Sequence, residues 1–246
     1  MSDAVVFESV SKSFGPRSVL KDVSFTVAAG TAFVLLGRSG TGKSVTLKLI
    51  DGLLKADSGE ITVDGTKITA LNSAALAPTR KKMGFLFQSA ALFDSISVGE
   101  NVAFPLRRNT QKKDSEIRDI VKGILEKVGL GKEFDSMPSE MSGGMRKRAG
   151  LARALAMEPS ILLVDEPSAG LDPITSTEID ELLIAIKTDH HATLIIVTHN
   201  MPSARRLADQ MGFLDDGKLL AHGTVQEMEQ SEHQLVRDFM KSKQGG

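Results

Sequence analysis

The chain of 246 residues contains no cysteine. This absence excludes disulfide bridges, thiolate metal sites and thiol nucleophiles, and it favours a reducing compartment. Long apolar runs are also missing, because the longest, at 32–37, 161–164 and 194–197, fall far short of the roughly 20 residues that cross a bilayer. The start of the chain, MSDAVVFESV, has no basic segment followed by an apolar one. We therefore expect no signal peptide and a cytoplasmic location.

An excess of either charge is missing too, because 30 Lys and Arg stand against 31 Asp and Glu, for a formal net charge of -1. Proteins that bind nucleic acid or anionic lipid by charge carry a basic excess. A local basic run, within MSGGMRKRAG at 141–150, has no interleaved aromatic residues. We therefore expect no nucleic-acid partner.

The length suits one α/β domain, with or without a small subdomain. Segments 5–14 and 23–27 are predicted to be antiparallel strands, and later apolar runs that alternate with helical patterns predict a parallel sheet. Segment 95–157 is helical in pattern and interrupts this alternation. The other predicted elements are helices at 43–54, 174–187 and after Pro202, a hairpin around 61–65, and strands at 83–87, 161–166 and 193–198.

The octapeptide GRSGTGKS at 37–44 matches G-x-x-x-x-G-K-[ST] and lies between an apolar strand and a helix, as a phosphate-binding P-loop requires. Backbone N–H groups and the helix N-terminus would face the phosphates, Lys43 would reach the β and γ oxygens, and Ser44 would ligate Mg²⁺. A chance glycine-rich turn is the alternative, at odds of about one in a hundred. The predicted nucleotide-binding residues here are Gly37, Arg38, Ser39, Gly40, Thr41, Gly42, Lys43, Ser44 and Val45.

The P-loop alone leaves kinases, GTPases, helicases and transport ATPases open, and the strand ILLVDEP at 161–167 narrows the choice. It ends in Asp165 and Glu166 at the edge where parallel sheets bind ligands. Asp165 would hold Mg²⁺, and Glu166 would act as general base for the attacking water. Solvated strand-end carboxylates are the alternative, but burying neighbouring carboxylates without a cation is costly.

Two more polar side chains end predicted strands. His199 follows the strand at 193–198 and can hydrogen-bond a γ-phosphate, and Gln88 closes the strand at 83–87 and can reach the metal or the water. Each alone is a weak signal. Combined with the P-loop they predict a catalytic set of Glu166, His199, Gln88 and Lys43 and a metal set of Ser44, Gln88 and Asp165.

In their order, these motifs resemble the nucleotide-binding subunit of the ATP-binding cassette (ABC) transporters over nearly the whole chain. The matching positions are Phe14 for stacking on adenine, the Walker A loop at 37–44, the Q-loop Gln88, the signature MSGGM at 141–145, the Walker B strand at 161–166, the D-loop SAGLD at 168–172 and the switch His199. The resemblance implies hydrolysis of ATP with Mg²⁺. It also implies nucleotide contacts by Phe14, Ser142, Gly143, Gly144 and Asp172.

In this family two copies pack head to tail, so each ATP lies between the P-loop of one copy and the signature of the other. The helix that follows Ser142 would offer free N–H groups to a γ-phosphate. A homodimer is therefore implied, with an incomplete site in one subunit alone. Met141 and Met145 depart from the usual Leu and Gln of the signature, which puts any contact of the glutamine side chain in doubt.

The stretches 87–107 and 142–155 are similar to the ATPases of Mla-type systems, which move phospholipids between the membranes of Gram-negative bacteria, and of relatives that work with mammalian-cell-entry (MCE) proteins. This resemblance implies a subunit on the inner face of the inner membrane. Its partners would be an integral membrane permease, an MCE-domain lipid-binding protein reached through the permease and, in some systems, a small STAS-domain protein. The ATPase of another small-molecule importer is the alternative.

The resemblance also implies a division of the single nucleotide-binding domain, 1–246. The ATP-binding core with its antiparallel β subdomain would comprise 1–94 and 158–223, the α-helical signature subdomain 95–157, and a tail 224–246. The tail has apolar residues at helical spacing, and its contact could be its own subunit, the sister ATPase or another partner.

Apolar residues after Gln88, among them Phe93, are predicted to line a groove for a permease helix, with ordinary packing as the alternative. Two other classes of function are disfavoured. A soluble ABC protein of ribosomes or DNA repair usually has two fused cassettes or a long coiled coil, which 246 residues do not hold. A nucleotide sensor without activity would not need the intact set of Lys43, Asp165, Glu166 and His199.

Overall fold

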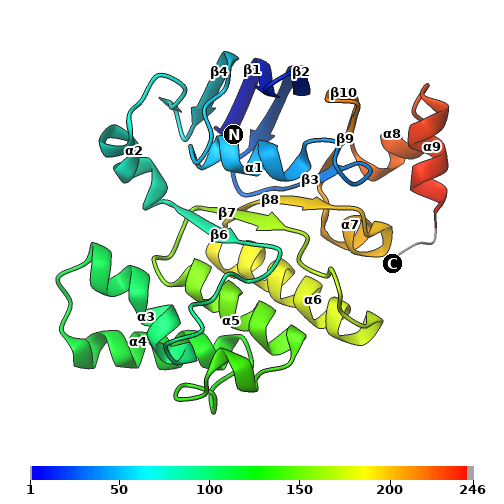
Figure 1. Cartoon of the computed structure of the whole chain (residues 1–246). Coiled ribbons are helices and arrows are strands. Elements are labelled where there is room, and N and C mark those ends of the chain that lie inside the picture. The colour runs from blue at the N-terminus through cyan, green and yellow to red at the C-terminus, as the bar shows by residue number, and fades with distance from the viewer. Residues whose placement is uncertain (1, 243–246) are drawn as a thin grey trace.

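The computed structural model describes residues 2–242 and contains two β-sheets, with helices between them and on the far side of the larger sheet (Figure 1). The strands are β1 (Asp3–Phe14), β2 (Arg17–Ala28), β3 (Ala32–Leu36), β4 (Ser58–Val63), β5 (Thr66–Lys67), β6 (Met83–Leu86), β7 (Ile161–Asp165), β8 (Thr193–Thr198), β9 (Gln210–Asp215) and β10 (Lys218–Gly223). The helices are α1 (Lys43–Ile50), α2 (Ser73–Arg80), α3 (Val98–Asn109), α4 (Asp114–Lys127), α5 (Gly143–Leu155), α6 (Pro173–His190), α7 (Met201–Leu207), α8 (Val225–Glu229) and α9 (Gln234–Lys241).

One sheet is antiparallel, with the order β2-β1-β4-β5, and the other has the order β10-β9-β3-β8-β7-β6. In the second sheet β9 and β10 pair antiparallel, and the remaining pairings are parallel. The carboxyl ends of β3, β7 and β8 therefore meet at one edge. This arrangement confirms the predicted α/β class, with a mostly parallel sheet and a separate antiparallel sheet.

Helix α1 lies between the two sheets, and β3 is buried along its whole length (Figure 1). Phe33 and Leu35 of β3 face α1 and the antiparallel sheet, while the alternate side chains of β3 face α6 and α7. Phe7, Phe25 and Phe33 stack with ring centroids 4.5 and 5.1 Å apart, which joins the sheets. This packing fixes the loop between β3 and α1 at the carboxyl edge.

Helices α3, α4 and α5 gather on the opposite side of the parallel sheet from α1 and share a third apolar cluster (Figure 1). Helix α5 approaches β6 so closely that a Cβ at Gly84 would lie 2.4 Å from the carbonyl oxygen of Ala154. Within residues 2–242, no helix is both long and apolar enough to cross a membrane. Residues 243–246, at the end of the predicted tail, lie outside the described part of the chain.

Several predicted bounds were wrong. Helix α1 ends at Ile50 and not at Leu54, because Gly52 takes a φ of 68° and turns the chain. Helix α2 was not predicted, and neither were strands β9 and β10. The predicted strands at 161–166 and 193–198 are confirmed within one residue. The antiparallel pair at the start is confirmed too, but β2 begins at Arg17, six residues before the predicted start at 23.

We predict that Gly84→Ala destabilises the protein by about 1–3 kcal/mol, because the methyl group has no space against the backbone of α5. The midpoint of urea unfolding measures the change. Gly123→Ala in α4 is the matched control, since a Cβ there meets nothing within 4 Å and alanine stabilises a helix interior by about 0.5–1 kcal/mol. Equal midpoints for the two variants would show that α5 and β6 can separate at little cost.

Candidate active site

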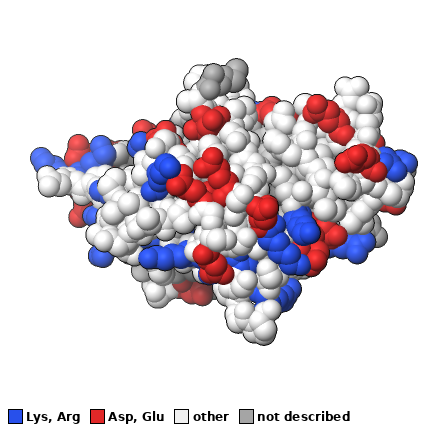
Figure 2. Space-filling view, turned by 90° about the horizontal axis from the view of Figure 1, so that it is seen from above, with Lys and Arg blue, Asp and Glu red and all other residues white. Residues whose placement is uncertain are grey.

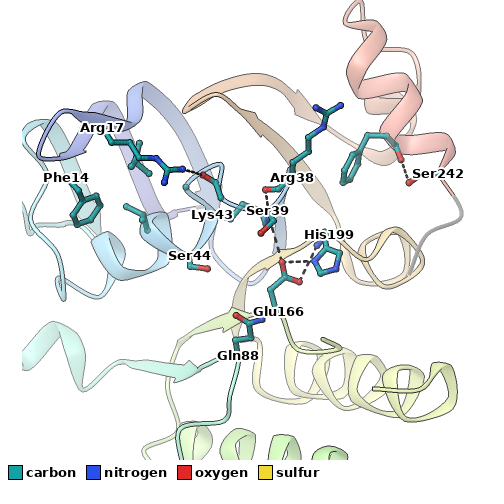
Figure 3. A pocket seen from close by; sticks show the side chains of 15 residues that line it. Phe14, Arg17, Arg38, Ser39, Lys43, Ser44, Gln88, Glu166, His199 and Ser242 are labelled. Atoms are coloured by element: carbon teal, nitrogen blue, oxygen red, sulfur yellow. Dashed lines mark hydrogen bonds and ion pairs between the residues drawn. The ribbon is translucent and has the colours of Figure 1, made fainter. Parts of the chain in front are cut away.

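A pocket of about 690 Å³ opens at the carboxyl edge of the parallel strands (Figure 3). We name it the P-loop pocket. Phe14 and Arg17 line it from the antiparallel sheet, and Gln88, Glu166 and His199 line it from the chain just beyond β6, β7 and β8. Its remaining lining residues are Val19, Arg38, Ser39, Gly40, Gly42, Lys43, Ser44, Val45, Phe239 and Ser242.

The loop between β3 and α1 is curled by glycines that no larger residue can replace. Gly37 has a φ of 152°, and a Cβ there would lie 2.3 Å from the carbonyl oxygen of Leu214. Gly42 begins α1 with a φ of 109° in the left-handed region. Thr41 is not among the lining residues, and its hydroxyl donates to the carbonyl of Arg38 at 2.9 Å. The loop backbone, not its side chains, thus forms the cradle.

Lys43 is folded over this loop and is only 6% exposed. Its ammonium donates to the carbonyl oxygens of Gly37 at 2.8 Å and Arg38 at 3.0 Å and lies 3.8 Å from Oε1 of Glu166. Burial lowers the pKa of Lys43, and attraction to Glu166 and Asp165 partly opposes this shift. A cation held beside backbone N–H groups suits a polyphosphate ligand.

Ser44 and Asp165 form the pair best suited to a metal ion. The Ser44 hydroxyl donates to Oδ1 of Asp165 at 2.9 Å. Burial raises the pKa of Asp165, and the hydrogen bond from Ser44 opposes the shift. Among residues 2–242 no group of three or more His, Cys, Asp or Glu side chains could hold a metal. The pair therefore fits Mg²⁺ that takes its other ligands from phosphates and water.

Glu166 follows β7 with a φ of 47°, in the left-handed region. Its backbone N–H donates to the carbonyl oxygen of Val197 at 2.9 Å. Its carboxylate lies against His199, with Oε1 3.0 Å from Nδ1 and Oε2 accepting the backbone N–H at 3.3 Å. Glu166 and His199 thus form a carboxylate–imidazole pair at the pocket, with Gln88 nearby (Figure 3).

The segment after Gln88 is strained and is held by α5. Ala90 and Ala91 have φ values of 62° and 49°, which residues with side chains rarely adopt. The guanidinium of Arg153 donates to the carbonyl oxygen of Ala90 at 2.8 Å and to that of Ala91 at 2.6 Å. Burial lowers the pKa of Arg153. The backbone next to Gln88 is therefore tied to α5.

The Ser-Gly-Gly segment lies outside the P-loop pocket. Ser142 caps α5, and its hydroxyl accepts the N–H of Met145 at 3.2 Å. Gly143 lines a second pocket, which Gln88 also lines. At Gly144 a Cβ would lie 2.5 Å from the methyl carbon of Thr175, so α5 and α6 meet closely there. One chain therefore does not bring this segment and the P-loop to the same pocket.

Asp172 also lies away from the P-loop pocket and caps α6. Its carboxylate accepts the Thr175 hydroxyl at 2.6 Å and the backbone N–H groups of Ile174 and Thr175 at 3.0 Å. The hydroxyl bond first, and then the backbone bonds, lower the pKa of Asp172. In this chain the carboxylate is thus engaged in starting the helix.

Sequence reasoning missed several residues. Arg17 faces Phe14 across the β1–β2 turn and donates to the carbonyl of Gly40 at 3.3 Å, which the hairpin register could have indicated. Phe239 and Ser242 reach the pocket from the C-terminal segment, and no sequence signal pointed to them. Lys147 belongs to the local basic run within 141–150, for which no role was predicted, but it is 5% exposed and donates to the carbonyl oxygen of Glu166 at 2.9 Å.

The fold and the pocket define a P-loop nucleotide-binding protein, because a strand, a glycine loop and a helix hold a buried lysine beside a serine–carboxylate pair. A family model described as ABC transporter matches residues 20–169. The chain belongs to the ABC transporter family and is an ABC ATPase. The family resemblance drawn from the motifs is confirmed.

The chain is 45% identical over 246 residues to the probable ribonucleotide transport ATP-binding protein mkl of Mycobacterium leprae, across 100% of this chain and 71% of that protein. It is 39% identical over 240 residues to the intermembrane phospholipid transport system ATP-binding protein MlaF of Escherichia coli K12, across 98% and 89% of the two chains. The dimeric post-hydrolysis structure of the ATP-binding cassette MJ0796 with ADP and phosphate is 31% identical, with a TM-score of 0.84 over 89% and 98% of the two chains.

We predict that Arg153→Met frees the strained turn after Gln88, because Ala90 and Ala91 lose a charged donor. Hydrogen bonds from a charged group contribute about 1.5–3 kcal/mol, so amide exchange in residues 88–93 should quicken by on the order of tenfold. Arg108→Met, at an exposed arginine of α3, is the control. If amide exchange in residues 88–93 is unchanged in Arg153→Met, the hydrogen bonds from Arg153 do not hold this segment in place.

Proposed function

We propose that the chain is the ATP-hydrolysing subunit of a bacterial inner-membrane transporter that moves phospholipid between the inner and outer membranes. The hydrolysis of ATP is supported by one observation. Five side chains meet at one edge of the sheet, namely Lys43, Ser44, Asp165, Glu166 and His199. The phospholipid cargo is supported by the relative that is named for intermembrane phospholipid transport, which is 39% identical over nearly the whole chain.

In the proposed site, Phe14 stacks on adenine from the β1–β2 hairpin. The N–H groups of residues 37–45 and the ammonium of Lys43 bind the phosphates. Ser44, Asp165 and Gln88 would hold Mg²⁺, which would neutralise negative charge on the phosphates of ATP. The 2.9 Å contact between Ser44 and Asp165 supports this metal assignment.

Glu166 serves as the general base. It accepts a proton from water as the water oxygen bonds to the γ-phosphorus and the bond from that phosphorus to the bridging oxygen breaks. His199 hydrogen-bonds the γ-phosphate and orients Glu166. Both roles are supported by the 3.0 Å distance between Nδ1 of His199 and Oε1 of Glu166, with the Lys43 ammonium 3.8 Å from the same oxygen.

The subunit acts as a head-to-tail homodimer. Ser142, Gly143, Gly144 and Asp172 face the nucleotide that is bound by the P-loop of the other copy. Their distance from the P-loop pocket of their own chain supports this, because contacts they cannot make in cis remain available to a second copy. The dimeric structures of the solved cassettes also support it.

The relatives' names do not agree on cargo, since one names ribonucleotide and another phospholipid. The ATPase of another small-molecule importer is accordingly the second candidate. Nucleic acid is not proposed as a partner. Figure 2 supports this on the face it presents, where acidic and basic side chains are interspersed and no broad field of one sign is visible.

We further propose that residues 95–157 form the signature subdomain between the core segments 1–94 and 158–223. The permease docks on that subdomain beside the Q-loop, and an MCE-domain lipid-binding protein and, in some systems, a STAS-domain protein complete the assembly. Phe93 and Phe104 support the docking site, because both are nearly half exposed, at 45% and 47%, with ring centroids 5.1 Å apart. The subunit is then peripheral on the cytoplasmic face of the inner membrane.

We predict that Glu166→Gln binds ATP normally and hydrolyses it at least on the order of a hundredfold more slowly, because a positioned general base contributes about 10²–10⁴. Steady-state phosphate release and equilibrium binding of ATP measure the two properties. Glu181→Gln, at an exposed glutamate of α6, is the control. Hydrolysis by Glu166→Gln at the wild-type rate would refute the assigned role.

We predict that the tagged chain, purified from detergent-solubilised native membranes, brings with it a permease and an MCE-domain protein, and that Phe93→Ala recovers much less of both. Truncation removes an exposed ring that the permease helix would cover. Leu53→Ala, at a similarly exposed side chain outside the segment that follows Gln88, is the control. Recovery of a permease without an MCE-domain protein would contradict the phospholipid cargo and favour another small molecule. Undiminished recovery of the permease with Phe93→Ala would refute the docking site.

A further inference from the structure

Lys147 is a buried cation that the family motifs do not assign. It lies in the second turn of α5, after the Ser142 cap, and is 5% exposed. Its ammonium donates to the backbone carbonyl oxygen of Glu166 at 2.9 Å. Burying an ammonium costs free energy unless partners compensate, so its position needs a reason beyond packing.

The atom that Lys147 binds belongs to a strained residue. Glu166 has a φ of 47°, and a non-glycine residue in this region is strained and persists only where neighbours fix it. The carbonyl of Glu166 also accepts the N–H of Ala169, at a longer 3.2 Å. Lys147 therefore supplies the shorter of two bonds that hold this peptide group.

The orientation of this peptide group determines where the Glu166 side chain points. With φ positive, the carboxylate lies at the P-loop pocket, 3.0 Å from Nδ1 of His199 and 3.8 Å from the ammonium of Lys43. Relaxation to a negative φ would rotate the Cα–Cβ bond and move the carboxylate from this position. Lys147 opposes that relaxation without touching the carboxylate.

Lys147 also connects two parts of the chain that are proposed to act at different ATP sites, the start of α5 and Glu166. Ser142 and Gly144 begin the same helix, and Gly144 lies against Thr175 at the start of α6. The Lys147 ammonium thus links the Ser142–Gly144 segment, which is proposed to face a second copy, to the peptide group of Glu166 in its own chain. A shift of the first turns of α5 would be felt at Glu166.

We propose that Lys147 is a positioning residue for ATP hydrolysis, which fixes the Glu166 peptide group and couples it to the Ser142–Gly144 segment of the same chain. The inference rests on the proposed roles of Glu166 as base and of the signature as a contact to the second copy. In a head-to-tail dimer this bond links the two ATP sites, because one chain contributes its signature to one site and its Glu166 to the other.

Lys147→Met tests the proposal, because methionine keeps the unbranched apolar stem and removes the N–H donors. We expect the kcat of the homodimer to fall by on the order of tenfold, as for other residues that orient a catalytic group, while KM for ATP changes by less than about twofold. The Hill coefficient for ATP should fall toward one. Lys147→Arg, which retains a charged donor, should recover part of the kcat, and Lys122→Met at an exposed lysine of α4 is the control.

Wild-type kcat and cooperativity in Lys147→Met would overturn the proposal. So would an equal loss in Lys147→Met and Lys147→Arg that accompanies a lower thermal midpoint and weaker ATP binding, because that pattern marks a structural role alone. If Lys147→Met does not fold, Lys147→Leu, which also lacks an N–H donor in its side chain, takes its place with the same criteria. Glu166→Gln, measured in parallel, separates the two hypotheses: if it is inactive while Lys147→Met is normal, only the positioning role fails.

Discussion

The site depends on a balance of buried charge at the carboxyl edge of the parallel sheet. Lys43, Lys147, Asp165 and Glu166 are each less than 10% exposed, and none could be buried there cheaply without the others. The two ammonium groups reach this edge from helices on opposite sides of the parallel sheet, Lys43 from α1 and Lys147 from α5. A nucleotide with its metal brings both signs of charge, so it can enter this edge without leaving one of these groups unpaired.

This balance explains why distant segments must meet. The P-loop at 37–45, the start of α5 and the end of β7 are far apart in the sequence, and each lies on an element that apolar packing holds in place. Phe33 joins the two sheets beneath the P-loop, and Gly84 lets α5 lie against β6. The charged groups therefore occupy positions that the core has already determined.

The motifs predicted most of the P-loop pocket, because chemistry restricts residue type and spacing at phosphate sites. Its lining residues Lys43, Ser44, Gln88, Glu166 and His199 were all found from the sequence. Lys147 was missed because it stands between Arg146 and Arg148, and a run of three basic residues does not reveal which one a helix turns inward. Strands β9 and β10 were missed although Asp-Gly at 216–217 is a hairpin signal. Phe239 and Ser242 depend on tertiary packing of α9 that local pattern does not encode.

Helix α5 connects these features, since two of its cations donate to the carbonyl oxygens of strained, left-handed residues. Lys147 holds Glu166 and Arg153 holds Ala90 and Ala91, so the end of β7 and the segment after Gln88 share one rigid element. A positive φ at a residue with a side chain stores free energy that is released if its clamp withdraws. Because a helix moves as a unit, a displacement of α5 would loosen both segments together, which makes α5 the part of the fold best placed to relate the state of the nucleotide to the surface around Phe93.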